Sequence, residues 1–316
     1  MKGFENVVQA YAEEGFSVFL TGSNSYLLSD EISTKLTGRY LKFETFTLDF
    51  SEYLEMKIFF KQDINPDMEI EFNEYILNGG FSKALEFNDI PARQTYAKGI
   101  IEEIFEKDIK TRKRISNVPV FERVQSFLLN NYSAPFSLNS LLECLKKEGY
   151  STKATTVRNY IEELKKAKII YECNRFGLKI KKAIKREQKY YLADMAIYFA
   201  MNTDNRFSYG PSLENLVYLY FVSNGYQVSV GKIGKLECDF IVRDQKQSYA
   251  YIQVTYTLQG VDREATEKIR ERKYRPFRSI KDGYPRYIIS LDKFREQLEG
   301  VNHINAIDLF LGKEHI

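Results

Sequence analysis

Residues 213–258 read LENLVYLYFVSNGYQVSVGKIGKLECDFIVRDQKQSYAYIQVTYTL. Apolar residues first recur at helical spacing, and Ser212 occupies the position of an N-cap. The period then changes to short β-rich runs separated by glycine and charged turns. The predicted strands are Gln227–Val230, Leu236–Val242 and Tyr249–Tyr256. This stretch therefore predicts one helix followed by three strands.

Three polar residues lie on this predicted helix and sheet. Glu214 is early in the helix, Asp239 is in the second strand and Gln253 is in the third. A carboxylate on an apolar strand is costly unless a metal, a proton or a partner compensates it. Two carboxylates and an amide oxygen are ligands suited to Mg²⁺ or Mn²⁺. The pattern predicts a divalent-metal site, and these three residues are also the predicted catalytic residues.

The order of these elements and residues resembles the PD-(D/E)xK, or restriction-endonuclease-like, nuclease core. The resemblance implies that Glu214, Asp239 and Gln253 hold Mg²⁺ and that a lysine two residues after Gln253 helps to activate water. Here that position is Thr255. The resemblance therefore favours the fold more than the chemistry. A lysine from a neighbouring element could restore the charge, and the candidates are Lys232, Lys235 and Lys268.

Composition narrows the class of protein. The chain has 316 residues, which predicts several domains, and its apolar content of 44% is enough for real cores. The net charge is +3, from 46 basic and 43 acidic residues, so no global field demands a nucleic-acid partner. Three widely spaced cysteines predict a reduced, cytoplasmic protein. No long apolar run or signal peptide is found, so no membrane partner is expected.

The N-terminal region reads as the start of a parallel α/β sheet. Phe4–Glu14 predicts an amphipathic helix, Ser17–Thr21 a fully buried strand and Asp30–Leu36 another helix. A continuous apolar strand followed by a polar loop is typical of such sheets. A parallel sheet cannot, however, be built from this single strand.

Several spaced motifs resemble the second half of an AAA+ ATPase module. They are Thr21-Gly-Ser-Asn-Ser25, Leu36-Thr-Gly-Arg39 and Leu48-Asp-Phe-Ser-Glu-Tyr53, with further matches at 75–85, 107–109, 213–215, 237–240, 251–258 and 282–285. The similar proteins are a large group of uncharacterised prokaryotic ATPases with a C-terminal domain of unknown function. The resemblance implies that Asn24 is the sensor for the hydrolytic water and that Arg39 reaches a neighbouring γ-phosphate.

The ATP-binding half of that module is missing from the sequence. No GxxxxGK[ST] motif occurs, and no apolar run ending in Asp-Glu precedes Phe4. We expect a family member that begins just after its Walker B strand. Asn24 and Arg39 would then be idle. ATP would bind only if an intact family ATPase supplied the missing half in trans. The expected partners are DNA, a second copy of the chain or such an ATPase.

Residues from about 118 to 195 show the order of a winged helix. Three helices are predicted first: Val120–Asn130, a second that Ser137 can cap, and Thr155–Lys166. Two predicted strands follow them, Ile169–Cys173 and Lys189–Leu192. The third helix reads the groove in helix-turn-helix proteins. The candidate DNA contacts are Arg158, Lys165, Lys166, Lys181 and Lys182. A role in protein contacts or domain spacing remains open.

The last segment completes the predicted αβββαβ order. Val261–Arg275 predicts a helix, Tyr287–Leu291 a strand, Lys293–Glu299 a helix and Ile307–Leu311 a short terminal helix. His303, placed in a turn, and His315, in the tail, are isolated, so neither is expected to bind metal or act in catalysis.

We therefore predict a multidomain α/β protein: an AAA+ remnant (1–60), a helical linker or lid (61–117), a winged helix (118–195) and a restriction-endonuclease-like domain (205–316). Two functions compete. One is a DNA-binding or scaffolding protein without its own ATPase activity; the other is a Mg²⁺-dependent DNA nuclease. The missing lysine at Thr255 favours the first.

Overall fold

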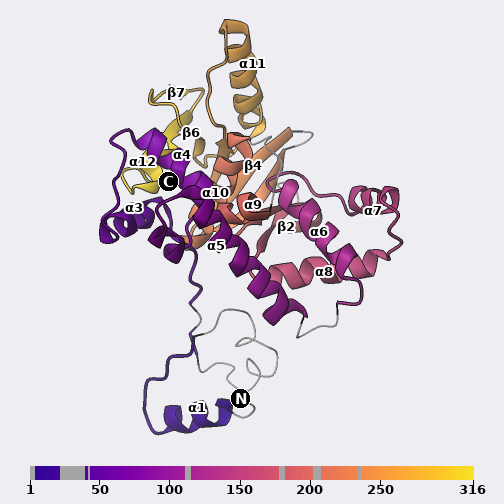
Figure 1. Ribbon diagram of the computed structural model, residues 1–316. Helices are drawn as coiled ribbons and strands as arrows, with labels where there is room; N and C mark the ends of the chain where they lie inside the picture. Colours follow the sequence, from indigo (N-terminus) through magenta and orange to yellow (C-terminus); the bar gives the residue numbers. More distant parts are fainter. Residues whose placement is uncertain are drawn as a thin grey trace.

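The computed structural model describes residues 4–21, 40–41, 43–110, 115–177, 182–201, 208–233 and 236–316. Within these ranges the protein is a mixed α/β structure with eleven α-helices and one eight-stranded sheet (Figure 1). No helix in the described ranges combines the length and apolar character needed to cross a membrane. Asn24, Arg39, Lys181, Lys235 and the predicted helix Asp30–Leu36 lie outside the described residues.

The sheet runs in the order β2-β1-β3-β4-β5-β6-β8-β7. Its strands are β1 (Ile170–Gly177), β2 (Lys182–Leu192), β3 (Gln227–Ile233), β4 (Leu236–Arg243), β5 (Tyr249–Val254), β6 (Arg286–Ser290), β7 (Gln297–Leu298) and β8 (Val301–Asn305). β1 is antiparallel to β2 and parallel to β3, with Arg175 opposite Val230. The two strands expected at the end of the winged helix, which form the hairpin β1–β2, therefore belong to one sheet with the C-terminal strands.

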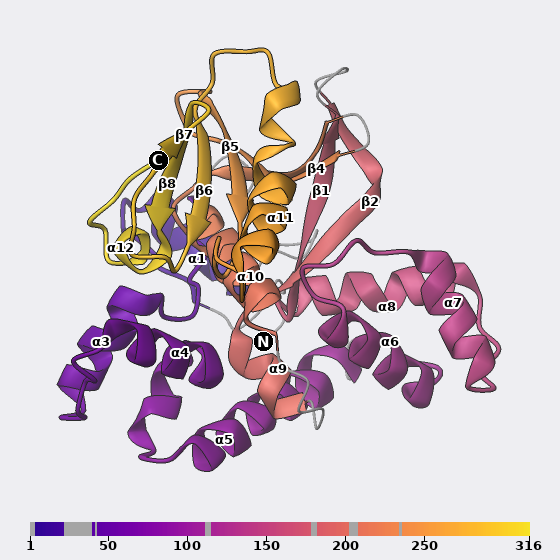
Figure 2. The same cartoon turned by 90° about the horizontal axis from the view of Figure 1, so that it is seen from above.

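Helices α10 (Tyr209–Ser223) and α11 (Arg263–Tyr274) pack on opposite faces of the sheet (Figure 2). Neighbouring residues of β5 divide between two hydrophobic clusters, Ile252 with the α10 side and Tyr251 with the α11 side, because side chains alternate along a strand. The expected order of α10, β3, β4, β5, α11 and β6 is observed. The N-cap of α10 is Ser208 rather than the expected Ser212, which is buried inside the helix.

The C-terminal end corrects two expectations. Lys293–Glu299 does not form a helix; it contains β7, which pairs with β8. Glu299 and Gly300 form the two-residue turn between these strands, and both have positive φ, as a tight hairpin requires. His303 is therefore in β8 and not in a turn. It is buried there, with its Nε2 2.8 Å from Ser290 Oγ. The short helix α12 (Ala306–Phe310) follows as expected.

A series of helices precedes the hairpin. They are α3 (Phe50–Phe59), α4 (Met68–Asn78), the 3₁₀ helix η2 (Ser82–Glu86), α5 (Ile90–Glu103), the π-helical segment η3 (Ile104–Lys110), α6 (Val118–Asn130), α7 (Leu138–Lys147) and α8 (Ala154–Lys166), and α9 (Met195–Met201) follows the hairpin. Ser137 caps α7 as expected, because its side chain accepts from the N–H of Ser140. Figure 2 shows α6, α7 and α8 grouped beside β1 and β2.

The predicted strand Ser17–Thr21 is wrong. Helix α1 (Phe4–Glu13) forms as expected and lies away from the sheet in Figure 1, but the residues after it have no strand structure. Phe19 is 88% exposed rather than buried. A strand needs a neighbour to satisfy its N–H and C=O groups, and the described sheet ends at β2 and β7. The apolar run has no strand to pair with in the described part of the chain.

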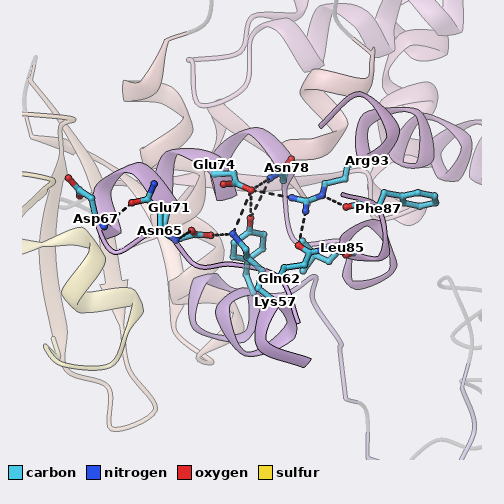
Figure 3. Close-up of polar contacts among 11 residues, drawn as sticks. Lys57, Gln62, Asn65, Asp67, Glu71, Glu74, Asn78, Leu85, Phe87 and Arg93 are labelled. Carbon is cyan, nitrogen blue, oxygen red and sulfur yellow. Dashed lines mark hydrogen bonds and ion pairs between the residues drawn. The ribbon is translucent and has the colours of Figure 1, made fainter. Parts of the chain in front are cut away.

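A buried polar network joins α3, α4 and α5 (Figure 3). Lys57 on α3 pairs with Glu71 on α4 at 2.5 Å, and both side chains are almost completely buried. Arg93 on α5 contacts Glu74 at 3.3 Å and donates to the Phe87 carbonyl at 2.9 Å. A buried charge is tolerable only when its partners are in place. The network therefore fixes how these three helices pack.

Asp194 fastens this helical unit to the end of β2. Its carboxylate accepts from the backbone N–H of Gly80 at 2.8 Å and from that of Ala196 at 2.7 Å, and it is buried. Burial raises the pKa of Asp194 to about 6. Gly79 has φ of +71°, and a Cβ placed there would lie 1.9 Å from Asp194 Oδ1. The contact therefore depends on glycine at position 79.

We expect Gly79→Ala to lower the free energy of unfolding by about 3 kcal/mol, because left-handed strain and a steric clash add. Gly99→Ala is the matched control: Gly99 lies within α5 and a Cβ there meets no atom within 4 Å. That variant should keep or slightly raise stability. Urea denaturation of both variants measures the difference. Equal stability of the two variants would contradict the role given to the contact between Asp194 and the Gly79-Gly80 turn.

Candidate functional site

Glu214 lies in the second turn of α10 and faces β2. Lys189 Nζ is 3.0 Å from Glu214 Oε1, and the Tyr191 hydroxyl donates to the same oxygen at 2.8 Å. Lys189 is 3% exposed, and its ammonium also pairs with Glu237 Oε1 at 2.5 Å. Glu237 is on β4, two residues before Asp239. Lys189 therefore connects the helix carboxylate with the strand that carries the second predicted ligand.

Asp239 on β4 and Gln253 on β5 meet at one lysine. Lys273 Nζ, from α11, is 2.9 Å from Asp239 Oδ2 and 3.3 Å from Gln253 Oε1. The Val254 N–H donates to Asp239 Oδ2 at 2.8 Å. The Gln253 amide nitrogen donates to the Glu237 carbonyl at 2.9 Å, which fixes the orientation of the amide and turns Oε1 toward Lys273.

The structure thus brings the three predicted site residues into one cluster and adds two lysines. The Thr255 hydroxyl donates to the Thr257 carbonyl at 3.0 Å rather than to any of these residues. Lys268 is also elsewhere, in an exposed pair with Glu264. Sequence reasoning missed Lys273 and Lys189. Lys273 left no spacing signal, since it lies at the end of a highly charged helix beside Tyr274, which is buried.

The electrostatics of the cluster differ between its carboxylates. Burial, reinforced by the charge of Asp239, raises the pKa of Glu214 to about 7 despite the Lys189 ion pair. Burial also disfavours ionised Asp239, but Lys273 and Lys189 outweigh it and lower the Asp239 pKa. For Lys189, burial opposes the charge, and the surrounding carboxylates Glu214, Asp239 and Glu237 raise its pKa. Lys189 and Asp239 are therefore charged at neutral pH.

The donor set fits a divalent cation. Among the described residues, the hydrogen bonds to Glu214 end on Oε1 and those to Asp239 end on Oδ2. Each carboxylate therefore keeps a second oxygen for a ligand. In the described part of the chain no group of three or more His, Cys, Asp or Glu side chains is placed to bind a metal, so the third donor would be the Gln253 amide. Mg²⁺ accepts one or two carboxylates and keeps several waters.

The predicted DNA contacts on α8 are not equivalent. Arg158 is exposed, and among the described residues it has no ion pair. Lys166 is 52% exposed and pairs with Glu163 at 3.4 Å. Lys165 is paired with both Glu162 and Glu172, at 2.8 and 2.6 Å, so much of its charge is compensated. The side chain of Lys182, at the start of β2, lies outside the described part.

Comparison with known proteins relates two regions to protein families. Residues 1–54 match a model described as an AAA domain, and residues 69–207 match one described as a domain of unknown function, DUF8612. The first match indicates an AAA-family relationship for the N-terminal segment. Both matches end before α10. Lys189 and Tyr191 fall inside the second match. The other residues of the cluster lie beyond it: Glu214, Asp239, Gln253 and Lys273.

Two similar proteins are described only as uncharacterized. One, from Haemophilus influenzae, is 28% identical over 314 residues, which cover 98% of this chain and 75% of that protein. The other, MJ1544 from Methanocaldococcus jannaschii, is 29% identical over 278 residues, which cover 85% of this chain and 62% of that protein. No solved structure matches the chain significantly.

The raised pKa of Glu214 predicts a pH dependence of stability. The folded state binds a proton at Glu214 more tightly than the unfolded state, whose ordinary value is 4.5, so stability falls as pH rises between 4.5 and about 7. Relative to Glu214→Gln, the wild-type free energy of unfolding should drop by about 2 kcal/mol between about pH 5 and pH 8. Denaturant titrations in EDTA measure this; parallel profiles for the two proteins would contradict it.

Proposed function

We propose that the cluster around Asp239 is a divalent-metal-dependent site for hydrolysis of phosphodiester bonds in DNA. The observation that carries the proposal is the position of Lys273, whose ammonium lies within 3.3 Å of both Asp239 and Gln253. The sequence places no lysine at position 255, and that absence by itself favours binding without catalysis. The ammonium of Lys273, which comes from α11, supplies the charge that position 255 lacks. Hydrolysis is therefore the better-supported function.

Each residue has a distinct role in this proposal. Glu214 and Asp239 would hold Mg²⁺ or Mn²⁺ through their unengaged carboxylate oxygens, and Gln253 through Oε1, which Lys273 also contacts. When bound, the cation would neutralise the charge that develops on the phosphate. Lys273 would orient the attacking water and stabilise the hydroxide character that it gains as its proton leaves. The water oxygen bonds to phosphorus and releases its proton to solvent, the bond from phosphorus to the leaving sugar oxygen breaks, and that oxygen takes up a proton from solvent.

The test is nicking of supercoiled plasmid with Mg²⁺ or Mn²⁺. We expect the wild type to cleave, Asp239→Ala to be inactive and Lys273→Met to be slower by about 10²–10³-fold, because one transition-state donor is removed. Lys268→Met is the matched control on the same helix, since Lys268 pairs with Glu264 in solvent, and it should retain full activity. Cleavage that survives in Asp239→Ala would refute the proposed site.

We take DNA as the substrate because α8, which would be the groove-reading helix of a winged helix, carries exposed cations. Arg158 and Lys166 are the exposed basic residues of α8 that support it. Phosphate contacts of this kind supply affinity without sequence preference. The restriction-endonuclease-like and winged-helix folds are part of this proposal, and they rest on the observed element order.

Reversing both charges, Arg158→Glu with Lys166→Glu, should weaken binding of unrelated duplexes to a similar extent. The slope of log affinity against log salt should also become shallower by about 0.9 for each phosphate that the variant no longer neutralises. Lys98→Glu on α5 is the control reversal, since Lys98 is 56% exposed and remote in sequence from α8. Fluorescence anisotropy in a salt series measures both quantities. Unchanged affinity in the double variant would exclude α8 as the contact surface.

A second candidate is the DNA-binding or scaffolding function without catalysis. The favouring observation is that lysines already pair with Glu214 and Asp239, which would let the cluster serve packing alone. The match of residues 1–54 to an AAA domain supports a further part of this proposal. The chain would act beside an intact family ATPase or pair with a second copy of itself, and ATP would bind only where such an ATPase supplies the phosphate-binding motif.

A further inference from the structure

The contact between β2 and the N-terminal half of α10 involves Glu214, one of the three proposed metal ligands. Two residues of β2, Lys189 and Tyr191, bond to the same oxygen of Glu214, at 3.0 and 2.8 Å. Since one carboxylate oxygen takes both donors, the rotamer of Glu214 is fixed and the direction of Oε2 is fixed with it. Ligands of a metal are commonly oriented in this way by partners that do not touch the metal.

Tyr191 is itself held in place. It is fully buried, and its ring stacks on Tyr218 of α10 with centroids 4.1 Å apart and planes 10° from parallel. Leu192, which follows Tyr191, and Asn215, which follows Glu214, continue the contact. The Leu192 N–H donates to Asn215 Oδ1 at 2.7 Å, and Asn215 Nδ2 donates to the Leu192 carbonyl at 3.0 Å. Asn215 thus imitates a neighbouring strand, and α10 cannot turn without breaking these bonds.

Lys189 extends the contact to β4. Its second partner, Glu237, is two residues from Asp239, and the backbone carbonyl of Glu237 orients the Gln253 amide. One buried ammonium therefore relates the helix that carries Glu214 to the strand that carries Asp239. Lys165 on α8 also bridges two glutamates, but among the described residues its partners are on α8 and β1, away from this cluster.

We propose that Lys189 and Tyr191 are positioning residues that set Glu214 for metal binding. The region matched by DUF8612 then supplies part of the site whose ligands lie beyond it. This inference rests on the proposed function, because it assumes that Glu214 binds the metal. Tyr191→Phe is its sharpest variant, since it removes one donor, keeps the stacked ring and leaves the charge unchanged.

The measurement is Mn²⁺ binding by calorimetry on EDTA-stripped full-length protein, without DNA. We expect Tyr191→Phe and Lys189→Met each to weaken Mn²⁺ affinity by about 10–100-fold, and Lys189→Arg to recover part of that affinity. Tyr190→Phe is the matched control on the same strand, because the Tyr190 hydroxyl bonds to Gln188 rather than to the cluster. Its affinity should equal that of the wild type.

The outcomes separate this inference from the proposed function. If the wild type binds Mn²⁺, Asp239→Ala does not, and Tyr191→Phe binds as well as Tyr190→Phe, the metal site stands and the positioning role is overturned. Tighter binding in Lys189→Met, with Tyr191→Phe unchanged, would also overturn it, because Lys189 would then compete with the metal. Wild-type protein that binds no Mn²⁺ overturns both. Should Lys189→Met fail to fold, Tyr191→Phe alone decides.

Discussion

Two donors on β2 hold one oxygen of the Glu214 carboxylate, and the arrangement of the surrounding elements depends on this contact. A carboxylate buried at this depth needs compensation, and Lys189 needs it equally, so each makes the burial of the other possible. The requirement joins α10 to β2, and through Glu237 it also joins β4. A helix, a hairpin and a central strand that are far apart in the sequence are thereby constrained by a single cluster of charges.

Local patterns were sufficient to predict most of the elements. Period, caps and turn residues placed α6, α7, α8, α10, α11 and β3 to β6 within a few residues, because each carries its own local pattern of apolar, capping and turn residues. The failures occurred where pairing partners decide the structure. Ser17–Thr21 has the composition of a buried strand but no neighbouring strand in the described chain. Lys293–Glu299 does not form a helix, because the Glu299-Gly300 turn lets β7 pair with β8.

The two acidic residues and the amide of the candidate cluster could be singled out from the sequence, and its two lysines could not. Glu214, Asp239 and Gln253 are conspicuous as polar residues in apolar surroundings, and a motif with fixed spacing directed attention to Thr255 for the missing charge. Lys273 and Lys189 come from α11 and β2, and no spacing rule connects those elements with β4 and β5. Their contribution follows from the packing of α11 on one face of the sheet and of α10 against β2. Such a lysine is recognised only after the fold is known.

The parallel pairing of β1 with β3 has a consequence for synthesis of the chain. Arg175 emerges from the ribosome long before Val230, its partner in the sheet, and pairings distant in sequence form slowly. Helices α6 to α8 can pack on one another early, while one edge of β1 stays unpaired until α10 and β3 have been made. During that interval Lys189 has neither Glu214 nor Glu237 beside it, so the nascent hairpin carries a solvated charge that becomes buried only when the last third of the protein arrives.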